Sequence, residues 1–193
     1  MYHDLPRAAS FWAFLFAIDQ DLAEAARRQG CSCGGRLHCA NYPRKPRGTP
    51  VPLSQPHCVR LCFCCDREGC RKRVTPPSVR FLGRKVYLGA VIVVISAMRQ
   101  GPSPRRVRLL SELYGVDRRT IARWQVFWRD HFPQTSFWKC ARARLVLLAK
   151  TVVLPYALVG AFLHRHVDRD GWARLLKFLA PITSTTGLPF AVS

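Results

Sequence analysis

The nine cysteines are the residues of this chain whose spacing most directly indicates chemistry. Eight of them fall between positions 31 and 70, and an odd total fits complete disulfide pairing poorly. The N-terminal segment carries Asp4 and has no basic start, so we expect no secretory signal peptide and therefore reduced thiols. Clustered reduced cysteines are typical metal ligands. The sequence therefore predicts a metal site and not a disulfide framework.

The expected site is a structural zinc centre that two short segments build together. The first cysteine turn is CSCGG at 31–35, and the second cysteine turn is CDREGC at 65–70. Four thiolates on such turns bind one Zn²⁺ as a tetrahedron, with Zn–S distances of about 2.3 Å. A catalytic zinc would need an open coordination position beside a general base. Apart from Asp66 and Glu68, which belong to the second turn itself, the sequence offers no such base near the cysteines. We therefore predict a structural role, and the predicted ligands are Cys31, Cys33, Cys65 and Cys70.

Other side chains near the two turns leave the ligand set open. Cys62 forms a C-x-x-C pair with Cys65. His38 or Cys39 could replace one of the two ligands of the first turn. Cys58 and Cys140 are expected to pack as small apolar side chains. The alternative ligands are His38, Cys39, Cys62 and Cys64.

The charge of the chain indicates a polyanionic partner. Lys and Arg total 31 against 11 Asp and Glu, a formal net charge of +20. Because such an excess destabilises a compact fold by self-repulsion, nucleic acid or an anionic membrane surface is the expected partner. Five prolines are expected to keep residues 43–56 extended and non-helical. On this basic arm, phosphates or a minor groove are the predicted contacts of Arg44, Lys45 and Arg47.

Residues 105–132 predict two helices joined by a short turn. Gly115 can adopt the positive φ that ends the first helix, and Asp117 is a favourable N-cap for a second helix beginning at Arg118. Apolar side chains recur at intervals of three and four in both segments. The expected apolar faces are Leu109, Leu110 and Leu113 in the first helix and Ile121, Trp124 and Trp128 in the second.

The second of these helices has the composition of a DNA recognition helix. Its first two turns place basic and hydroxyl side chains largely away from the apolar face, where base edges and phosphates can be contacted. The apolar segment 83–101 is expected to supply the preceding helix of a three-helix unit. The predicted contacts with double-stranded DNA are Arg118, Arg119, Thr120 and Arg123.

The order of these segments resembles the zinc-ribbon plus helix-turn-helix modules of bacterial insertion-sequence transposases and their short accessory proteins. The resemblance rests on CxCGG, on GCRKR-TPPSVRF and on GVDRRTIARW, and it covers roughly residues 31–132. It implies that the ribbon and the Arg-rich helix bind the DNA at element ends. The first cysteine turn is shorter than the usual pattern of that family.

Catalysis by this chain is not expected. A transposase active site needs three well-spaced carboxylates that hold two Mg²⁺ ions. After the Arg-rich helix the chain has Asp130, Asp168 and Asp170 and no Glu. We therefore predict a binding protein and not an enzyme.

Further helices are predicted on both sides of these segments. An N-terminal helix over 11–29 ends at Gly30, and three C-terminal helices are separated near Pro155 and Asp168. The apolar stripe expected on the N-terminal helix is Trp12, Leu15, Ile18, Leu22 and Ala25.

A membrane span over residues 145–163 is the alternative that these apolar segments raise. Lys150 lies inside that stretch, where a charge costs roughly 2.5–3.5 kcal/mol near the bilayer centre, and Pro155 divides it. We therefore expect no membrane insertion.

The predicted fold is mainly α, a helix-turn-helix bundle with a small zinc-ribbon insertion, a short β-hairpin, near the N-terminus. A mobile C-terminal tail is expected after the last helix. The predicted segments are 1–30 for the N-terminal helix, 31–78 for the ribbon with its basic arm, 79–133 for the helix-turn-helix, 134–180 for the C-terminal helices and 181–193 for the tail.

Together these features predict a cytoplasmic, nucleoid-associated protein that binds double-stranded DNA and serves transposition or recombination as an accessory or regulator of a mobile element. A transposase or recombinase is an expected partner, and self-association is compatible with the sequence. One alternative is a protein that binds structured RNA by shape and phosphate contacts. Another is a non-catalytic subunit of a larger nucleoprotein effector complex, in which the apolar C-terminal helices dock a partner enzyme.

Overall fold

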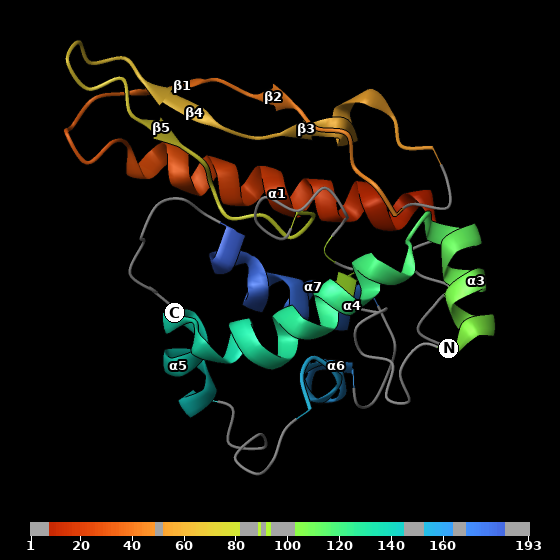
Figure 1. The fold of residues 1–193 in the computed structure, drawn as a ribbon. Coiled ribbons are helices and arrows are strands. Elements are labelled where there is room, and N and C mark those ends of the chain that lie inside the picture. The colour runs from red at the N-terminus through yellow and green to blue at the C-terminus, as the bar shows by residue number, and fades with distance from the viewer. Residues whose placement is uncertain are drawn as a thin grey trace.

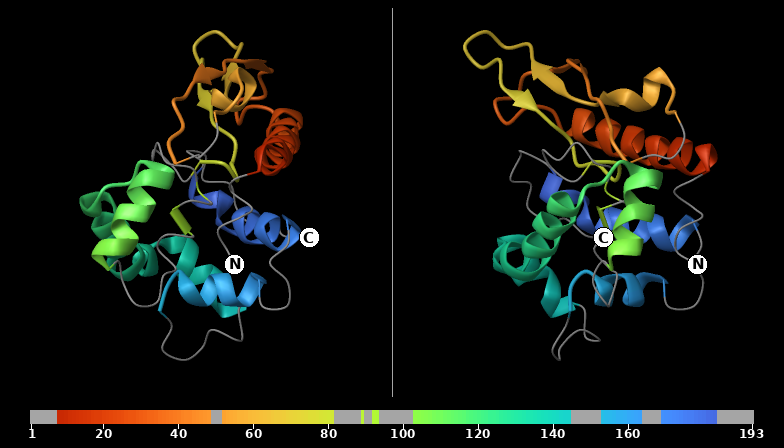
Figure 2. Two further views of the ribbon diagram at one scale, coloured as in Figure 1. Left: turned by 90° about the vertical axis from the view of Figure 1, so that its right-hand side faces the viewer. Right: turned by 45° about the vertical axis from the view of Figure 1, so that its right-hand side comes forward.

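The computed structural model describes residues 8–48, 52–81, 89, 92–93, 103–144, 153–163 and 169–183. Within these ranges the protein is mainly helical and has a small antiparallel sheet, as the sequence predicts. The strands form a layer along α1 (Ala9–Gln29), and the other α-helices lie together below both in the view of Figure 1. Figure 2 shows the same division from two further directions.

The N-terminal helix α1 packs one stripe against the rest of the protein and ends at Gly30, whose φ is 73°. Most of the expected stripe lies inward, but Ala25 is exposed, and Ala26 is buried in its place. At about 100° per residue, position 26 returns close to the face of Trp12, whereas position 25 lies roughly 140° away. The prediction of Ala25 was therefore wrong by one position.

Five short strands make up the strand layer. In the three-stranded sheet, β4 (Phe63–Cys65) lies between β1 (Leu37–Cys39) and β5 (Arg73–Val74), and all pairs are antiparallel. In the second sheet, β2 (Tyr42–Pro43) pairs with β3 (Val59–Arg60). The pairing brings the end of β4 beside the start of β1, with Leu37 opposite Cys65.

The Pro-rich segment is less extended than the sequence predicts. Residues Gln55–Cys58 form a short 3₁₀ helix, η2, with Pro56 in its first turn. Proline fits that position because its fixed φ suits the start of a helix and no N–H is needed there. The expectation of an extended chain through residue 56 therefore fails at its C-terminal end.

The two helices predicted around residue 115 are present. The first, α3 (Pro104–Tyr114), ends before Gly115, whose φ is 60°, and α4 (Arg118–Val126) begins after Asp117. The Asp117 side chain accepts a hydrogen bond from Thr120 N at 2.7 Å, which is the expected N-cap. A π-helical turn η3 (Phe127–His131) and a 3₁₀ turn η4 (Phe132–Gln134) continue the chain.

The inward faces of these two helices follow the prediction with one exception. In α4 and η3 the buried side chains include Ile121, Trp124 and Trp128. In α3, Leu110 is buried and Leu113 is partly buried, but Leu109 is 53% exposed. Adjacent positions on a helix differ by about 100°, so Leu110 can lie inward while Leu109 is exposed to solvent, with Leu113 between them.

Three C-terminal helices are present, as the sequence predicts. They are α5 (Ser136–Ala141), α6 (Tyr156–Leu163) and α7 (Arg169–Leu179), with short 3₁₀ turns η5 (Arg142–Arg144) and η7 (Ala180–Thr183). Thr183 is buried, so the packed chain extends beyond position 181, where the mobile tail was expected to begin. Most of the predicted helix over 83–101, and residues 184–193, lie outside the described residues.

The prediction that the chain does not insert into a membrane can be compared with the helices of the described residues. No helix among the described residues combines the length and the apolar character that crossing a bilayer requires. In the stretch 145–163, α6 accounts for Tyr156–Leu163, and residues 145–152 lie outside the described part.

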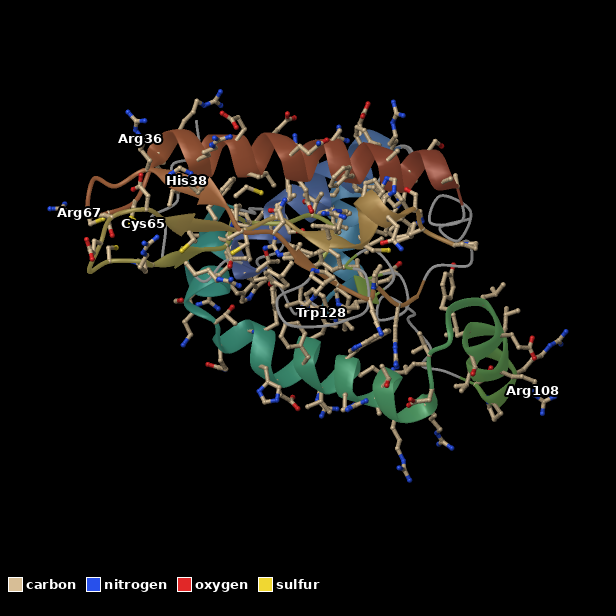
Figure 3. All side chains as sticks on the ribbon, turned by 90° about the horizontal axis from the view of Figure 1, so that it is seen from above. Arg36, His38, Cys65, Arg67, Arg108 and Trp128 are labelled. Carbon is tan, nitrogen blue, oxygen red and sulfur yellow. The ribbon has the colours of Figure 1, made fainter. Side chains whose placement is uncertain are left out.

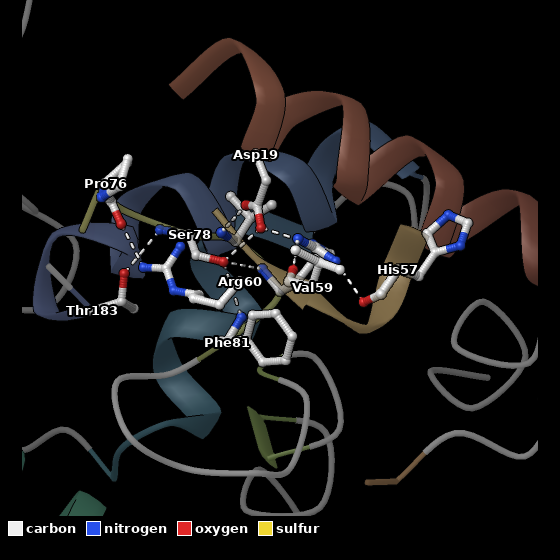
Figure 4. A network of polar contacts seen from close by, with 10 residues as sticks. Asp19, His57, Val59, Arg60, Pro76, Ser78, Phe81 and Thr183 are labelled. Carbon is white, nitrogen blue, oxygen red and sulfur yellow. Dashed lines mark hydrogen bonds and ion pairs between the residues drawn. The ribbon is translucent and has the colours of Figure 1, made fainter. Parts of the chain in front are cut away.

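A buried polar network joins α1 to the strand layer and to η7 (Figure 4). The carboxylate of Asp19 accepts hydrogen bonds from Ser78 Oγ at 2.6 Å, from Val79 N at 2.7 Å and from Arg80 Nε at 2.7 Å. Arg80 also donates to the carbonyls of His57 and Val59 at 2.7 and 2.9 Å. Both charged side chains are almost completely buried, so this ion pair lies in the interior.

Candidate metal centre

The four cysteines predicted as ligands lie together at one end of the strand layer. Their sulfur atoms all lie within 4.8 Å of one another. The Cys31 and Cys70 sulfurs are 3.7 Å apart, and the Cys33 and Cys65 sulfurs are 3.5 Å apart. A tetrahedron with metal–sulfur distances of about 2.3 Å has edges of roughly 3.8 Å. These four residues, called the metal centre below, are geometrically suited to one metal ion.

Backbone hydrogen bonds shape the two cysteine turns. In the first turn, Gly34 N donates to Cys31 O at 2.8 Å and Cys31 N donates to Gly35 O at 3.2 Å. In the second turn, Cys70 N donates to Arg67 O at 3.1 Å. Each turn therefore presents two sulfurs toward the same point without a long loop between them.

A small apolar cluster supports the metal centre from beneath. It contains side chains of α1, β1, β4 and β5, and it is separate from the larger core that the other helices share. Cys31 and Cys65 are themselves buried in it, whereas Cys33 and Cys70 are partly exposed. The other buried members are Ala23, Leu37, Phe63 and Val74.

The thiols of the metal centre differ in acidity. A hydrogen bond from the Gly35 backbone lowers the pKa of the Cys33 thiol to about 6. Burial raises the pKa of the Cys65 thiol to about 12. Cys33 is therefore the sulfur best prepared to meet a cation as a thiolate at neutral pH.

The alternative ligands make other contacts. His38 Nε2 lies 3.2 Å from Asp66 Oδ2, and that carboxylate also accepts from Arg36 N at 2.9 Å. The Cys62 thiol lies against Thr75, and the Cys64 thiol donates to Arg71 O at 3.4 Å. The residues that lie outside the group of four sulfurs are His38, Cys39, Cys62 and Cys64.

The two cysteines expected to fill apolar spaces behave differently from each other. Cys58 is partly buried, and its thiol donates to Leu53 O at 3.9 Å. Cys140 is exposed on α5, so the prediction that it packs inside was wrong.

Gly35 is required by the close approach of the two cysteine turns. A Cβ at this position would lie 2.5 Å from the Cys65 sulfur and 3.0 Å from Arg67 Cβ. We expect Gly35→Ala to weaken metal binding by about tenfold or more, because a ligand sulfur must move. Competition with a chromophoric chelator measures this affinity, and Ser32→Ala in the same exposed turn is the control. Equal affinities of the two variants would contradict the argument.

On α4, three of the four predicted nucleic-acid contacts are exposed. Arg118, Arg119 and Arg123 lie on the surface, whereas Thr120 is 5% exposed. The Thr120 hydroxyl accepts from Arg123 Nη2 at 2.8 Å and contacts the Asp117 carboxylate at 3.2 Å. The Thr120 hydroxyl therefore links the Asp117 cap to Arg123, and because it is buried it offers little surface to a partner.

On the basic arm, Arg44 differs from its neighbours. Lys45 and Arg47 are exposed, but Arg44 is partly buried with its guanidinium 5.6 Å from the ring centre of Phe81. Its backbone N–H also donates to Cys58 O at 2.6 Å. Of the three predicted phosphate contacts on the arm, Lys45 and Arg47 are therefore exposed to a partner and Arg44 is only partly exposed.

Sequence reasoning missed a group of basic residues beside the metal centre. They are exposed on the segment before β1, on the second cysteine turn, and on the residues that join this turn to β5 and begin that strand. The run GCRKR at 69–73 is the signal that could have indicated them. The residues of this basic rim are Arg36, Arg67, Arg71, Lys72 and Arg73.

Comparison with known proteins does not assign the chain to a family. The sequence matches no family model, and no curated protein or solved structure is significantly similar to it. The function must therefore be argued from the residues and their arrangement.

Proposed function

We propose that the protein binds double-stranded DNA through α4 and that a structural zinc ion at the metal centre holds the strand layer together. The observation that carries DNA binding is the arrangement of α4. Its apolar side is buried, its N-terminus is capped by Asp117, and its first turns expose Arg118, Arg119 and Arg123. An N-terminal end of this kind can enter a major groove while the opposite side stays packed.

The chemistry of the four ligands supports zinc. Four thiolates in a tetrahedron are typical of Zn²⁺ or iron–sulfur sites, and a site closed by four protein ligands is typical of structural zinc. All four ligands come from two short turns at the edge of a small sheet, an arrangement compatible with a zinc ribbon. The ion would replace the large apolar core that this part of the chain lacks.

The proposed biological role is that of an accessory or regulator of a mobile element, working beside a transposase or recombinase. The resemblance of CxCGG, GCRKR and GVDRRTIARW to transposase modules supports this role. A net charge of +20 supports a polyanionic partner in general.

The two basic elements are expected to divide the work of binding. Replacing Lys45 and Arg47 by Ala should weaken binding to every duplex alike and lower the log–log salt slope by about 0.9 for each phosphate that the variant no longer neutralises. Replacing Arg119 and Arg123 by Ala should narrow the difference between a selected duplex and a scrambled one, because each bidentate Arg–guanine contact discriminates by roughly 1–3 kcal/mol. Fluorescence anisotropy at several salt concentrations measures both quantities.

Competition with structured RNA is the control for this experiment. If RNA displaces the selected duplex more effectively than unlabelled duplex does, the protein is an RNA-binding protein and the proposal is wrong. The α4 assignment also fails if both pairs of substitutions reduce binding to the selected and scrambled duplexes by the same factor.

A further inference from the structure

In both cysteine turns the residue after the second cysteine has a positive φ, but the two residues differ in type. Cys33 is followed by Gly34 with φ 82°, and Cys70 is followed by Arg71 with φ 43°. Arg71 is the one residue other than glycine with positive φ among the described residues. Side chains with a Cβ are strained in this region, whereas glycine is not. The fold alone would therefore favour glycine at position 71, as it has glycine at position 34.

Among the described residues, the Arg71 side chain makes no contact that would stabilise the folded chain against this strain. It is exposed, and within the described part of the chain its guanidinium makes no hydrogen bond or ion pair. The contacts of Arg71 are made by its backbone: its N–H donates to Arg67 O at 3.3 Å, and its carbonyl accepts from the Cys64 thiol. A glycine would make both contacts equally well.

The surroundings of Arg71 are also of like charge. The basic rim places Arg67, Lys72 and Arg73 close in sequence to Arg71. Of the two acids in the same turn, Asp66 already accepts hydrogen bonds from other groups, and Glu68 is exposed. Figure 3 shows Arg36 and Arg67 projecting outward at this end of the strand layer. Mutual repulsion of these cations adds to the backbone strain.

We propose that Arg71 contacts a backbone phosphate of bound nucleic acid and that the basic rim is a second phosphate-binding surface, an inference that rests on the proposed function. Strain held at one residue persists where its side chain is needed for binding. A phosphate would neutralise the repulsion within the rim and accept hydrogen bonds from the Arg71 guanidinium. Arg67 already donates to Cys33 O, and Arg73 lies over the ring of Tyr42, so Arg71 is the member of the rim with the most donors to offer. Figure 1 places α4 among the helices, away from the end of the strand layer where β1 and β5 lie, so the rim is distinct from the α4 surface.

A rival explanation is that the basic rim offsets the charge of the metal centre. Four thiolates around a divalent ion leave two net negative charges, which nearby cations stabilise. On that explanation, removing Arg71 would speed metal release and would leave nucleic-acid binding by a metal-saturated protein unchanged.

Three variants of the full-length, zinc-loaded chain separate these explanations. Arg71→Gly removes the strain and the charge, Arg71→Gln removes the charge alone, and Arg174→Gln removes one exposed charge from α7 as the control. With selected and scrambled duplexes, both Arg71 variants should bind roughly three- to tenfold more weakly than wild type at about 0.1 M salt, by the same factor for either duplex. Arg174→Gln should bind as wild type does.

Stability and metal release complete the test. Arg71→Gly should unfold at a denaturant concentration at least as high as wild type, and zinc release should be unchanged. Wild-type binding by both Arg71 variants, or faster zinc release without a binding defect, would overturn the inference about the rim and leave the α4 proposal standing. A wild-type chain that binds no duplex would instead overturn the proposed function, and this inference with it.

Discussion

Removing the metal ion is expected to unfold the strand layer around the metal centre while the helical core remains folded. The apolar cluster beneath the centre is small, and its strands are two or three residues long. Strands of this length are not stable by themselves. For small sites of this kind the free energy of metal binding, about 10–16 kcal/mol for structural zinc in peptides, is the free energy of folding.

Hydrogen exchange measured by mass spectrometry checks this expectation. After chelation, the amides of β1, β4 and β5 should exchange rapidly, and those of α4 and α7 should stay protected. Cys70→Ser should give the same pattern without a chelator, whereas Cys140→Ser, at an exposed cysteine outside the metal centre, should behave as wild type. Retained protection of β4 in the metal-free chain would show that no ion is needed there.

Asp19→Asn is expected to lower the free energy of unfolding by about 3–5 kcal/mol, because Arg80 would be left as an uncompensated buried charge. The two side chains are 1% exposed or less, and the carboxylate holds three donors at 2.6–2.7 Å. Urea unfolding of the metal-loaded protein measures the change as a shift in midpoint.

A matched control and a double variant sharpen this second test. Asp130→Asn removes the carboxylate of the exposed Arg129–Asp130 pair and should leave the midpoint unchanged within error. Adding Arg80→Met to Asp19→Asn should recover part of the stability, because the unpaired charge of Arg80 is then removed from the interior; Arg60 stays buried in both variants. If Asp19→Asn costs no more than Asp130→Asn, the buried network does not hold α1 to the strand layer.

Features encoded by a few neighbouring residues could be predicted from the sequence. Asp117 caps α4, Gly115 has positive φ and Gly30 ends α1, because each depends on local backbone hydrogen bonds and sterics. The metal centre could also be predicted, although its halves lie more than thirty residues apart. Reduced cysteines that are this closely spaced in a sequence are typical metal ligands, so residue type alone indicates that the two halves bind the same ion.

Features set by tertiary packing could not be predicted. Asp19 and Arg80 are 61 positions apart, and nothing near either residue indicates its partner. The burial of Thr120 depends on how α4 lies on the core, and residue type alone suggests an exposed hydroxyl. The positive φ of Arg71 follows from closing the second cysteine turn, whose geometry is not visible in the letters GCRKR.

DNA recognition by α4 is tested most directly by selection from a pool of random-sequence duplexes with the zinc-loaded, full-length protein, followed by sequencing of the bound fraction. The wild type is expected to enrich a shared sequence motif, and the Arg119→Ala/Arg123→Ala variant is expected to enrich none while still retaining duplex through phosphate contacts. Enrichment of the same motif by both proteins, or of no motif by the wild type, would contradict recognition through this helix.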